Sequence, residues 1–149
     1  MPDREPGALL GTSHFRVMIG REELGFAEVT RLASVTDLEL PPDERRDRFE
    51  TVVLRRALGR DTALYDWRRS VVDGKSDRRQ VTIHQLEGPG GRIVNSWRLV
   101  RAWPCRWSGP SFDAQSSEIA VEELELAFDD LVWLRPRQRQ RSRPTTQGA

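Results

Sequence analysis

Apolar and polar residues alternate along the first third of the chain. Phe15, Val17 and Ile19 share one face of a segment that begins at His14, and a turn follows around residues 21–23. A second segment runs on to residue 36 and carries Leu24, Phe26, Val29 and Leu32. A period of two is typical of a strand, so the pattern predicts a β-hairpin over residues 14–36.

Paired prolines and dense mixed charge interrupt the alternation between Asp37 and Arg48, in the sequence DLELPPDERRDR. Because proline cannot donate a hydrogen bond to a neighbouring strand, this segment is predicted to be an exposed loop. Apolar and β-branched residues return at positions 49–58, and Gly59 follows them. They indicate a third strand.

The period then changes from two to between three and four. Leu64, Trp67 and Val71 recur at helical spacing, Asp61 or Thr62 can cap the start, and Gly74 can end the segment. This is the one convincing helix, about three turns long. A single amphipathic helix in a β-rich chain is expected to lie across a barrel mouth or a sheet face.

A second hairpin is predicted over residues 79–103. Val81 and Ile83 face one way in its first strand, and the glycine-rich residues 88–91 supply the turn. The partner strand is expected to end at Pro104. Its predicted core face carries Ile93, Trp97, Leu99 and Trp103.

The last strand, up to Leu134, has an irregular apolar pattern. Ile119 and Val121 are apolar at odd positions, whereas Leu124, Leu126 and Phe128 are apolar at even ones. A β-bulge at Glu122 and Glu123 would restore the register. The alternative is a strand covered on both faces, by the core and by a neighbouring subunit. The fold class is therefore mainly β with one α-helix, a small antiparallel barrel or sandwich over residues 14–134.

Charge divides the 149-residue chain into a mildly acidic body and a basic end. Residues 1–134 carry 19 basic and 23 acidic groups, whereas residues 135–149 carry five arginines and no acid. An acidic body argues against general nucleic-acid binding. Residues 1–13 are expected to be a flexible arm and residues 135–149 a disordered tail. The N-terminus shows no signal-peptide pattern, so a cytoplasmic protein is expected.

Candidate chemistry is sparse. His14 and His84 lack metal-ligand partners at recognisable spacing, and the single Cys105 excludes an intramolecular disulfide. Ser111 lies outside any nucleophile-elbow motif. The carboxylates near residue 122 are typical of the wet face of a strand. They could also form the acidic half of a subunit contact whose basic half includes Arg55, Arg56, Arg68 or Arg69.

Three motifs carry a family resemblance across residues 14–134. The helix contains Leu64-Tyr65-Asp66-Trp67, and the following hairpin contains Trp97 and then Ala102-Trp103-Pro104. The third motif is the closing block PSFDAQSSEIAVEELEL. With these motifs the chain resembles the inner tube proteins of contractile phage tails and related contractile injection systems. Ser117 stands where the family commonly has asparagine, and the charged loop after the first hairpin is shorter than the family's stacking loop.

The resemblance implies a hexameric ring in which strands of six subunits join into one continuous inner β-barrel. Rings would stack into a hollow tube that a contracting sheath drives through a target envelope. The implied function is structural, as an inner tube subunit or as a tube-initiator ring at the baseplate. Implied partners are further copies, sheath, baseplate and spike proteins, and cargo in the lumen. Neither specific nucleic-acid binding nor membrane insertion is expected.

The resemblance also implies assembly in the bacterial cytoplasm, within a phage-tail-like particle that can be released from the cell. No catalytic, cofactor or metal residue is predicted. The predicted assembly interface consists of Asp113, Ser117, Glu118, Glu122, Glu123, Arg55 and Arg56. The residues predicted to define the fold are Leu64, Trp67, Trp97, Trp103, Pro104 and Phe112.

Two hypotheses from other classes remain open at the level of the sequence. The first is a monomeric β-barrel that binds a small apolar ligand in a pocket lined by Trp97, Trp103, Trp107 and Trp133. The second is a small hydrolase that uses Cys105 or Ser111 as its nucleophile. An assembly subunit would need neither a pocket nor a nucleophile.

Overall fold

The computed structural model describes residues 11–135. The predicted arm and tail therefore lie almost entirely outside the described residues. Within the described part, no helix has the length and apolar character needed to cross a membrane. In chain order the elements are β1 (Phe15–Ile19), β2 (Glu22–Leu24), β3 (Glu28–Val29), β4 (Ser34–Thr36), β5 (Asp47–Phe49), β6 (Val52–Ala57), α1 (Ala63–Val72), β7 (Arg79–Leu86), β8 (Ile93–Ser108), β9 (Val121–Ala127) and β10 (Asp130–Leu134).

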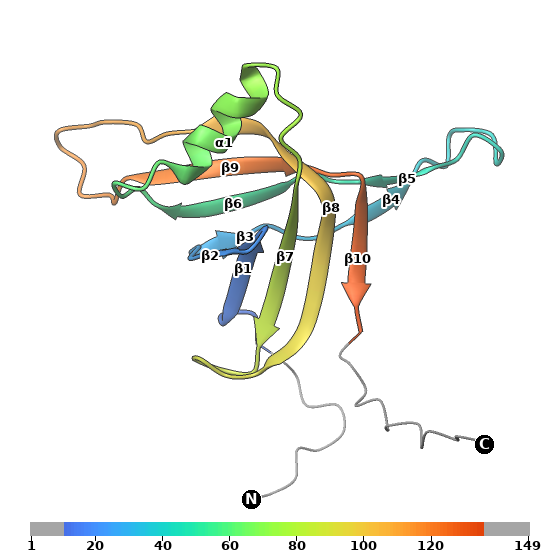
Figure 1. Ribbon diagram of the computed structural model, residues 1–149, viewed down its shortest axis with the longest axis horizontal. Helices are drawn as coiled ribbons and strands as arrows, with labels where there is room; N and C mark the ends of the chain where they lie inside the picture. Colours follow the sequence, from blue (N-terminus) through green and yellow to red (C-terminus); the bar gives the residue numbers. More distant parts are fainter. Residues whose placement is uncertain (1–10, 136–149) are drawn as a thin grey trace, which may run out of the picture.

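Two antiparallel sheets share the long strand β8. The first sheet has the order β2-β1-β7-β8-β10, and the second has the order β8-β9-β6-β3. In Figure 1, β6 and β9 run across the upper part of the molecule, whereas β7, β8 and β10 lie roughly vertically below them. The core lies between the sheets. This arrangement confirms the predicted fold class, mainly β with one helix.

A bend in β8 allows this strand to serve both sheets. Arg101 has a positive φ of 53°, and the pairing with β7 shifts register between Arg79 and Val81. Leu99 before the bend and Ala102 after it are both fully buried. The side chains that face the core therefore change from odd-numbered to even-numbered positions at the bend. Trp103 therefore leaves the core face, which corrects the prediction that it shares a face with Leu99.

The predicted end of this strand at Pro104 is also wrong, because β8 continues to Ser108 and pairs with β9. Pro104 is fully buried and lies beside a register shift between Pro104 and Arg106. Proline has no N–H to donate to a neighbouring strand. It is tolerated at such an irregularity, where the regular hydrogen-bonding pattern is already interrupted. This irregularity on β8 was not predicted from the sequence.

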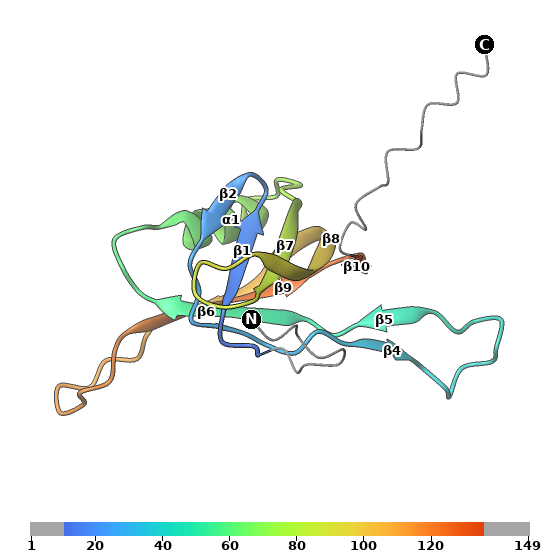
Figure 2. The same cartoon turned by 90° about the horizontal axis from the view of Figure 1, so that it is seen from below.

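The first hairpin is confirmed for β1 and β2, where Val17 pairs with Leu24. Residues 24–36, however, do not form one strand of that hairpin. β3 pairs with β6, and β4 pairs with β5, so Asp47 and Arg48 belong to a strand that was predicted to be loop. The β4–β5 ribbon, with the tip at residues 37–46, forms an arm that projects from the body (Figures 1 and 2).

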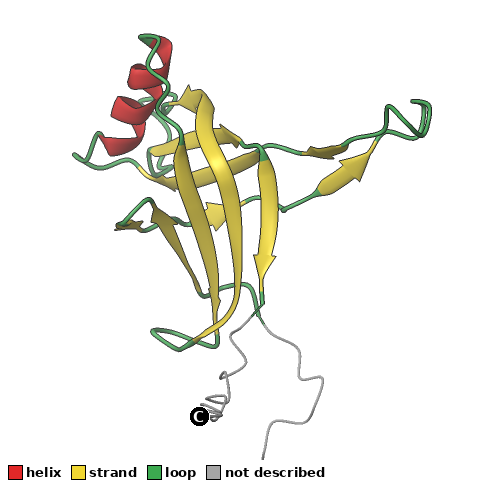
Figure 3. Ribbon diagram, turned by 45° about the vertical axis from the view of Figure 1, so that its right-hand side comes forward, coloured by secondary structure: helices red, strands yellow, loops and turns green. Residues whose placement is uncertain are grey.

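The predicted helix is confirmed as α1. Leu64 and Trp67 point into the core, each 1% exposed, and the Trp67 indole Nε1 donates to the Asp77 carbonyl oxygen at 2.8 Å. Thr62 is the N-cap residue and makes no side-chain cap hydrogen bond, whereas Asp61 Oδ1, one residue earlier, accepts from the Ala63 backbone N–H at 2.8 Å. Gly74 adopts a φ of 89° after the helix end, as expected of a C-terminal glycine. Figure 3 shows α1 at one end of the sheets, away from the arm.

The closing segment is two strands. β9 alternates regularly, with Glu122, Leu124 and Leu126 buried, and it pairs with β6 without a register shift. The predicted bulge at Glu122 and Glu123 is therefore wrong. Ile119 caused the apparent phase error, but it lies before the strand and is 77% exposed. After Ala127 the chain crosses to the first sheet, where β10 pairs with β8.

Candidate assembly interface

Residues 109–120 form a loop between β8 and β9, hereafter the projecting loop. It extends from the body on the side opposite the β4–β5 arm (Figures 1 and 2). Its two large apolar side chains, Phe112 and Ile119, are 89% and 77% exposed. The predicted interface residues Asp113, Ser117 and Glu118 lie in this loop and are exposed. The loop carries the predicted contact residues on a surface that the chain itself leaves uncovered.

Local hydrogen bonds order the tip of the projecting loop. Asp113 Oδ1 accepts from the Gln115 N–H at 3.0 Å, and the Asp113 carbonyl accepts from the Ser116 N–H at 3.0 Å. Ser116 Oγ accepts from the Glu118 N–H at 3.1 Å. Such side-chain turns are typical of Asp and Ser. Asp113 therefore stabilises the turn of this loop. From the sequence it was predicted only as an interface residue.

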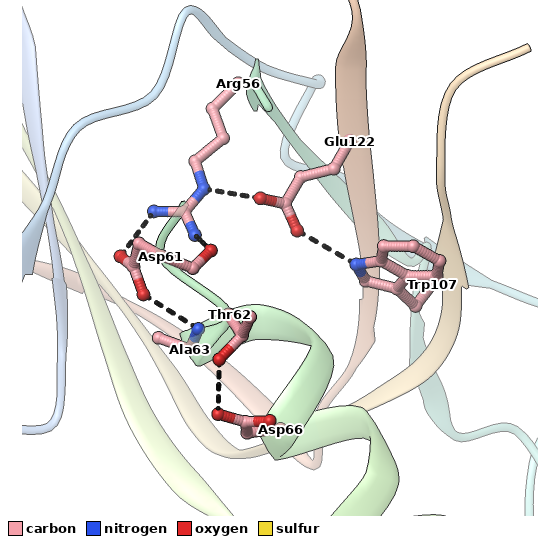
Figure 4. A network of polar contacts seen from close by, with 7 residues as sticks. All are labelled: Arg56, Asp61, Thr62, Ala63, Asp66, Trp107 and Glu122. Atoms are coloured by element: carbon pink, nitrogen blue, oxygen red, sulfur yellow. Dashed lines mark hydrogen bonds and ion pairs between the residues drawn. The ribbon is translucent and has the colours of Figure 1, made fainter. Parts of the chain in front are cut away.

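The base of the projecting loop is closed by Trp107 and Glu122, which stand on β8 and β9. Trp107 Nε1 donates to Glu122 Oε1 at 2.9 Å (Figure 4). The Trp107 ring also packs edge-on against Tyr65 of α1, with 5.2 Å between ring centroids. A Cβ at Gly109 would lie 2.8 Å from the same indole, so a larger residue there would force the Trp107 ring to shift. This arrangement sets how the loop leaves the body.

Glu122 also forms a buried ion pair with Arg56. Arg56 Nε donates to Glu122 Oε2 at 3.0 Å, and the two side chains are 12% and 2% exposed. Arg56 Nη1 reaches Asp61 Oδ2 at 3.3 Å, which links the pair to the start of α1 (Figure 4). Both carboxylate oxygens of Glu122 are thus paired within the subunit. This pair therefore stabilises the subunit itself, and the assignment of Glu122 and Arg56 to a subunit interface stays a prediction.

Arg55 and Glu123 lie on the opposite, exposed face of the same two strands. Arg55 Nε lies 3.6 Å from Glu123 Oε1, and Arg55 Nη1 lies 3.8 Å from Glu28 Oε2 on β3. Their side chains are between 43% and 58% exposed. The predicted charge complementarity between Arg55 and the glutamates is therefore satisfied inside one chain. The exposed face remains available to solvent or to a partner.

This exposed face of the second sheet carries several charged side chains. Glu125 on β9 pairs in register with Arg106 on β8, next to the Arg55 and Glu123 pair. The opposite face carries Leu54, Leu124 and Leu126, which are fully buried. The second sheet therefore has one dry face and one wet, charged face.

The four tryptophans proposed to line one ligand pocket are dispersed. Trp97 stacks on Trp133 with 5.7 Å between ring centroids, whereas Trp103 lies under the Arg78 guanidinium. Trp107 lies at the base of the projecting loop. Trp97 borders a hollow of about 180 Å³ near Phe15, and Trp103 borders a different one of about 240 Å³. This geometry argues against a single pocket lined by all four.

Of the residues predicted to define the fold, Leu64, Trp67 and Pro104 lie in the core. Trp97 and Trp103 are half-buried. Phe112 is different, because its high exposure means that it contributes almost nothing to the packing of its own chain.

The side chains considered for catalysis are held in ordinary contacts. His84 Nδ1 lies 2.6 Å from Ser96 Oγ, and burial, with a smaller contribution from Arg16, lowers the pKa of His84 below 6.5. The Cys105 thiol donates weakly to the Glu125 carbonyl at 3.5 Å. Burial and the Glu125 carboxylate raise the pKa of Cys105, which disfavours the reactive thiolate. Ser111 is exposed in the projecting loop. Among residues 11–135 no group of three potential ligands could hold a metal ion.

A family model described as "T4-like virus tail tube protein gp19" matches residues 42–132, from the arm to β10. The chain belongs to this tail tube family. The match includes the helix, the bent strand β8 and the whole projecting loop. No curated protein sequence matches the chain.

Solved structures share the tail tube fold. A chain of the PVC sheath–tube complex, from an extracellular contractile injection system, is 23% identical with a TM-score of 0.71, and the alignment covers 87% of this chain and 94% of that one. The tube-terminating cap of the anti-feeding prophage is 21% identical with a TM-score of 0.72, covering 90% and 96%. Hcp1 from Flavobacterium johnsoniae is 12% identical with a TM-score of 0.58, covering 80% and 93%.

Trp107 and Asp61 were not among the predicted site residues, although they complete the network around Glu122. One signal for the buried glutamate was present, because Glu122 shares the even positions of Leu124 and Leu126. The pairing of Trp107 with Glu122 had no such signal, since it depends on the bend in β8.

Proposed function

We propose that this protein is a structural subunit of a contractile injection particle, in its inner tube or in the tube-initiator ring at the baseplate. The observation that carries the proposal is the tail tube family match from residue 42 to residue 132. The exposed Phe112 and Ile119 on an internally ordered loop support it, because exposed apolar side chains on a rigid projection mark interaction sites.

Six copies would form a ring whose lumen is lined by the wet face of the second sheet. The charged residues of that face would contact water or passing cargo, while the buried face supplies the core of each subunit. β3 stands at the open end of this sheet, and pairing with a neighbouring copy would remove that edge. The result would be a continuous hollow barrel of strands.

The role would be mechanical and not catalytic. The tube would act as a rigid conduit inside a sheath, and sheath, baseplate and spike proteins would be its partners. A chain of similar fold in a sheath–tube complex supports a sheath partner, and a chain of similar fold in the baseplate of the anti-feeding prophage supports a baseplate partner. Assembly would take place in the cytoplasm.

Electron microscopy of the purified protein, alone and mixed with sheath and baseplate proteins of a contractile injection particle, tests the proposal. Rings with six-fold symmetry, free or stacked into tubes, are the expected result. Monomers that persist under both conditions would contradict it. Reporter cargo of either charge, loaded during assembly, would then show whether the lumen is accessible.

A further inference from the structure

A hydrophobic hollow of about 180 Å³ lies at the end of the first sheet where β1 begins and β7 ends, at the bottom of Figure 1. Its apolar walls come from both sheets and from the segment after β3, and they consist of Phe15, Val29, Leu32, Ile83 and Trp97. All of these side chains except Ile83 are only partly buried. Apolar side chains are therefore left open to solvent at this end, where a further apolar contact would stabilise the fold.

The chain that leads into β1 is fixed at the edge of this hollow. Gln85 Nε2 donates to the Gly11 carbonyl oxygen at 2.9 Å, and the Leu86 N–H donates to the His14 carbonyl oxygen at 2.9 Å. Thr12, which lies between these two attachments, borders the hollow. Because consecutive Cα atoms are about 3.8 Å apart, the residue just before Gly11 is within reach of the hollow.

Gln85 is itself held by a series of hydrogen bonds across the first sheet. Asn95 Nδ2 donates to Gln85 Oε1 at 2.9 Å, and Trp133 Nε1 donates to Asn95 Oδ1 at 3.2 Å. The Trp133 ring stacks on Trp97, which lines the hollow. Because Asn95 engages the amide oxygen of Gln85, the amide nitrogen is directed to the Gly11 carbonyl. The attachment point of the chain at Gly11 is thus determined by β7, β8 and β10 together.

The sequence places apolar side chains directly before this attachment point. Leu9 and Leu10 immediately precede Gly11, whereas residues 2–7 contain no large apolar side chain. A cavity of about 150 Å³ can hold a benzene ring, so a hollow of about 180 Å³ can hold a leucine side chain. Side chains two residues apart in an extended chain share a face, and Thr12 borders the hollow. This alternation selects Leu10 and not Leu9.

We propose that Leu10 docks into the hollow of its own chain and completes the core at this end of the first sheet. The same chain is favoured over a second copy, because a short tether at Gly11 gives the side chain a high effective concentration at the hollow. Residues 10–13 would then belong to the folded domain, in place of the flexible arm predicted for residues 1–13. The inference concerns the single subunit and does not depend on assembly.

Urea denaturation of full-length variants, followed by tryptophan fluorescence, tests whether Leu10 contributes to the core. Leu10→Ser should lower the urea midpoint by about 0.5 M, because it removes a buried leucine side chain. Leu9→Ser is the matched control one residue away and should leave the midpoint unchanged. Leu10→Met keeps an apolar side chain of similar volume and should retain most of the wild-type midpoint. Equal midpoints for the two serine variants would overturn the proposal.

Disulfide formation then identifies which chain supplies Leu10. In a protein with Cys105→Ser, which removes the only native thiol, Leu10→Cys is combined with Leu32→Cys, and the control combines Leu9→Cys with Leu32→Cys. Because a disulfide needs Cα atoms within about 7 Å and converging Cβ atoms, the intrachain disulfide should be at least about fivefold more abundant with Leu10→Cys than in the control. Cross-linking no greater than the control would overturn the proposal. A disulfide-linked dimer in place of the intrachain product would also overturn it, because the hollow would then hold the segment of a second copy.

Discussion

Two ion pairs stand side by side across β6 and β9 and behave differently. The side chains of Arg56 and Glu122 are only 12% and 2% exposed. Each carboxylate oxygen of Glu122 accepts a hydrogen bond, one from Arg56 and one from Trp107. Arg55 and Glu123 are one residue away and are 46% and 43% exposed. Because strand side chains alternate between faces, one residue of displacement moves an identical pair from the core to the wet face.

The difference shows that complementary charge alone does not tell a buried ion pair from an exposed one. Both pairs join opposite charges within one chain, and all four residues were predicted to lie at the assembly interface. The structural role of each pair depends on whether it is buried. The inner pair ties α1, β6 and the base of the projecting loop together, whereas the outer pair decorates the exposed face.

The largest expected effect is that of Glu122→Lys. This substitution removes the partner of buried Arg56 and adds a second buried cation, so it should destabilise the fold by about 3–5 kcal/mol or more. Urea denaturation followed by tryptophan fluorescence measures the change. Glu123→Lys is the matched control and should leave the midpoint close to that of the wild type. Equal losses for the two variants would contradict the assignment of Glu122 to the core.

Trp107→Phe should have the next largest effect. It keeps an aromatic ring against Tyr65 but removes the indole donor, which leaves Glu122 Oε1 unpaired in a buried site. The expected loss is about 1–3 kcal/mol of unfolding free energy, the usual range for a buried polar group without a partner. Trp133→Phe, at an exposed position, provides the control. An unchanged stability would mean that the hydrogen bond to Trp107 does not support Glu122.

His84 and Ser96 form a half-buried polar pair, intermediate between the two ion pairs. Because the pKa of His84 is lowered in the folded state, the unfolded chain binds the proton more readily. The unfolding free energy should therefore decrease as the pH falls through 6.5 towards the folded pKa. His84→Gln should remove this slope. Thermal unfolding at several pH values measures this pH dependence. If the same dependence persists in the variant, a group other than His84 causes it.

The smallest effect is expected for Glu123→Gln. The exposed pair with Arg55 should contribute below about 1 kcal/mol, and salt should screen most of that. Denaturation at low and high ionic strength checks both points. A loss comparable with that of Trp107→Phe would show that the exposed face is less accessible to water than its geometry indicates.

The sequence predicted the elements whose patterns are local. Leu64, Trp67 and Val71 identified the helix because a helical period needs only neighbouring residues. The failures occurred where tertiary context decides. Pro104 was taken as a strand end, but a bulge on β8 accommodates it. Ile119 suggested a bulge in β9, but an exposed apolar side chain outside any strand has no local signature.

The candidate site was predicted only in part for the same reason. The exposed loop residues were found from the closing motif, whereas the network of Arg56, Asp61, Trp107 and Glu122 joins segments up to 66 positions apart. The sequence does not show which of two adjacent glutamates faces inward until the pairing of β6 with β9 is known.

Residues that build the subunit are distinct from residues proposed to join subunits, and a substitution of Phe112 tests this distinction most directly. Phe112→Ser should leave the unfolding free energy unchanged, because the ring is 89% exposed, but should abolish assembly. The measurement is electron microscopy of purified wild-type and Phe112→Ser protein side by side, with denaturation curves of both. The expected result is rings or tubes for the wild type and folded, unassembled subunits for the variant. Assemblies of the variant that match the wild type in number and length would contradict it.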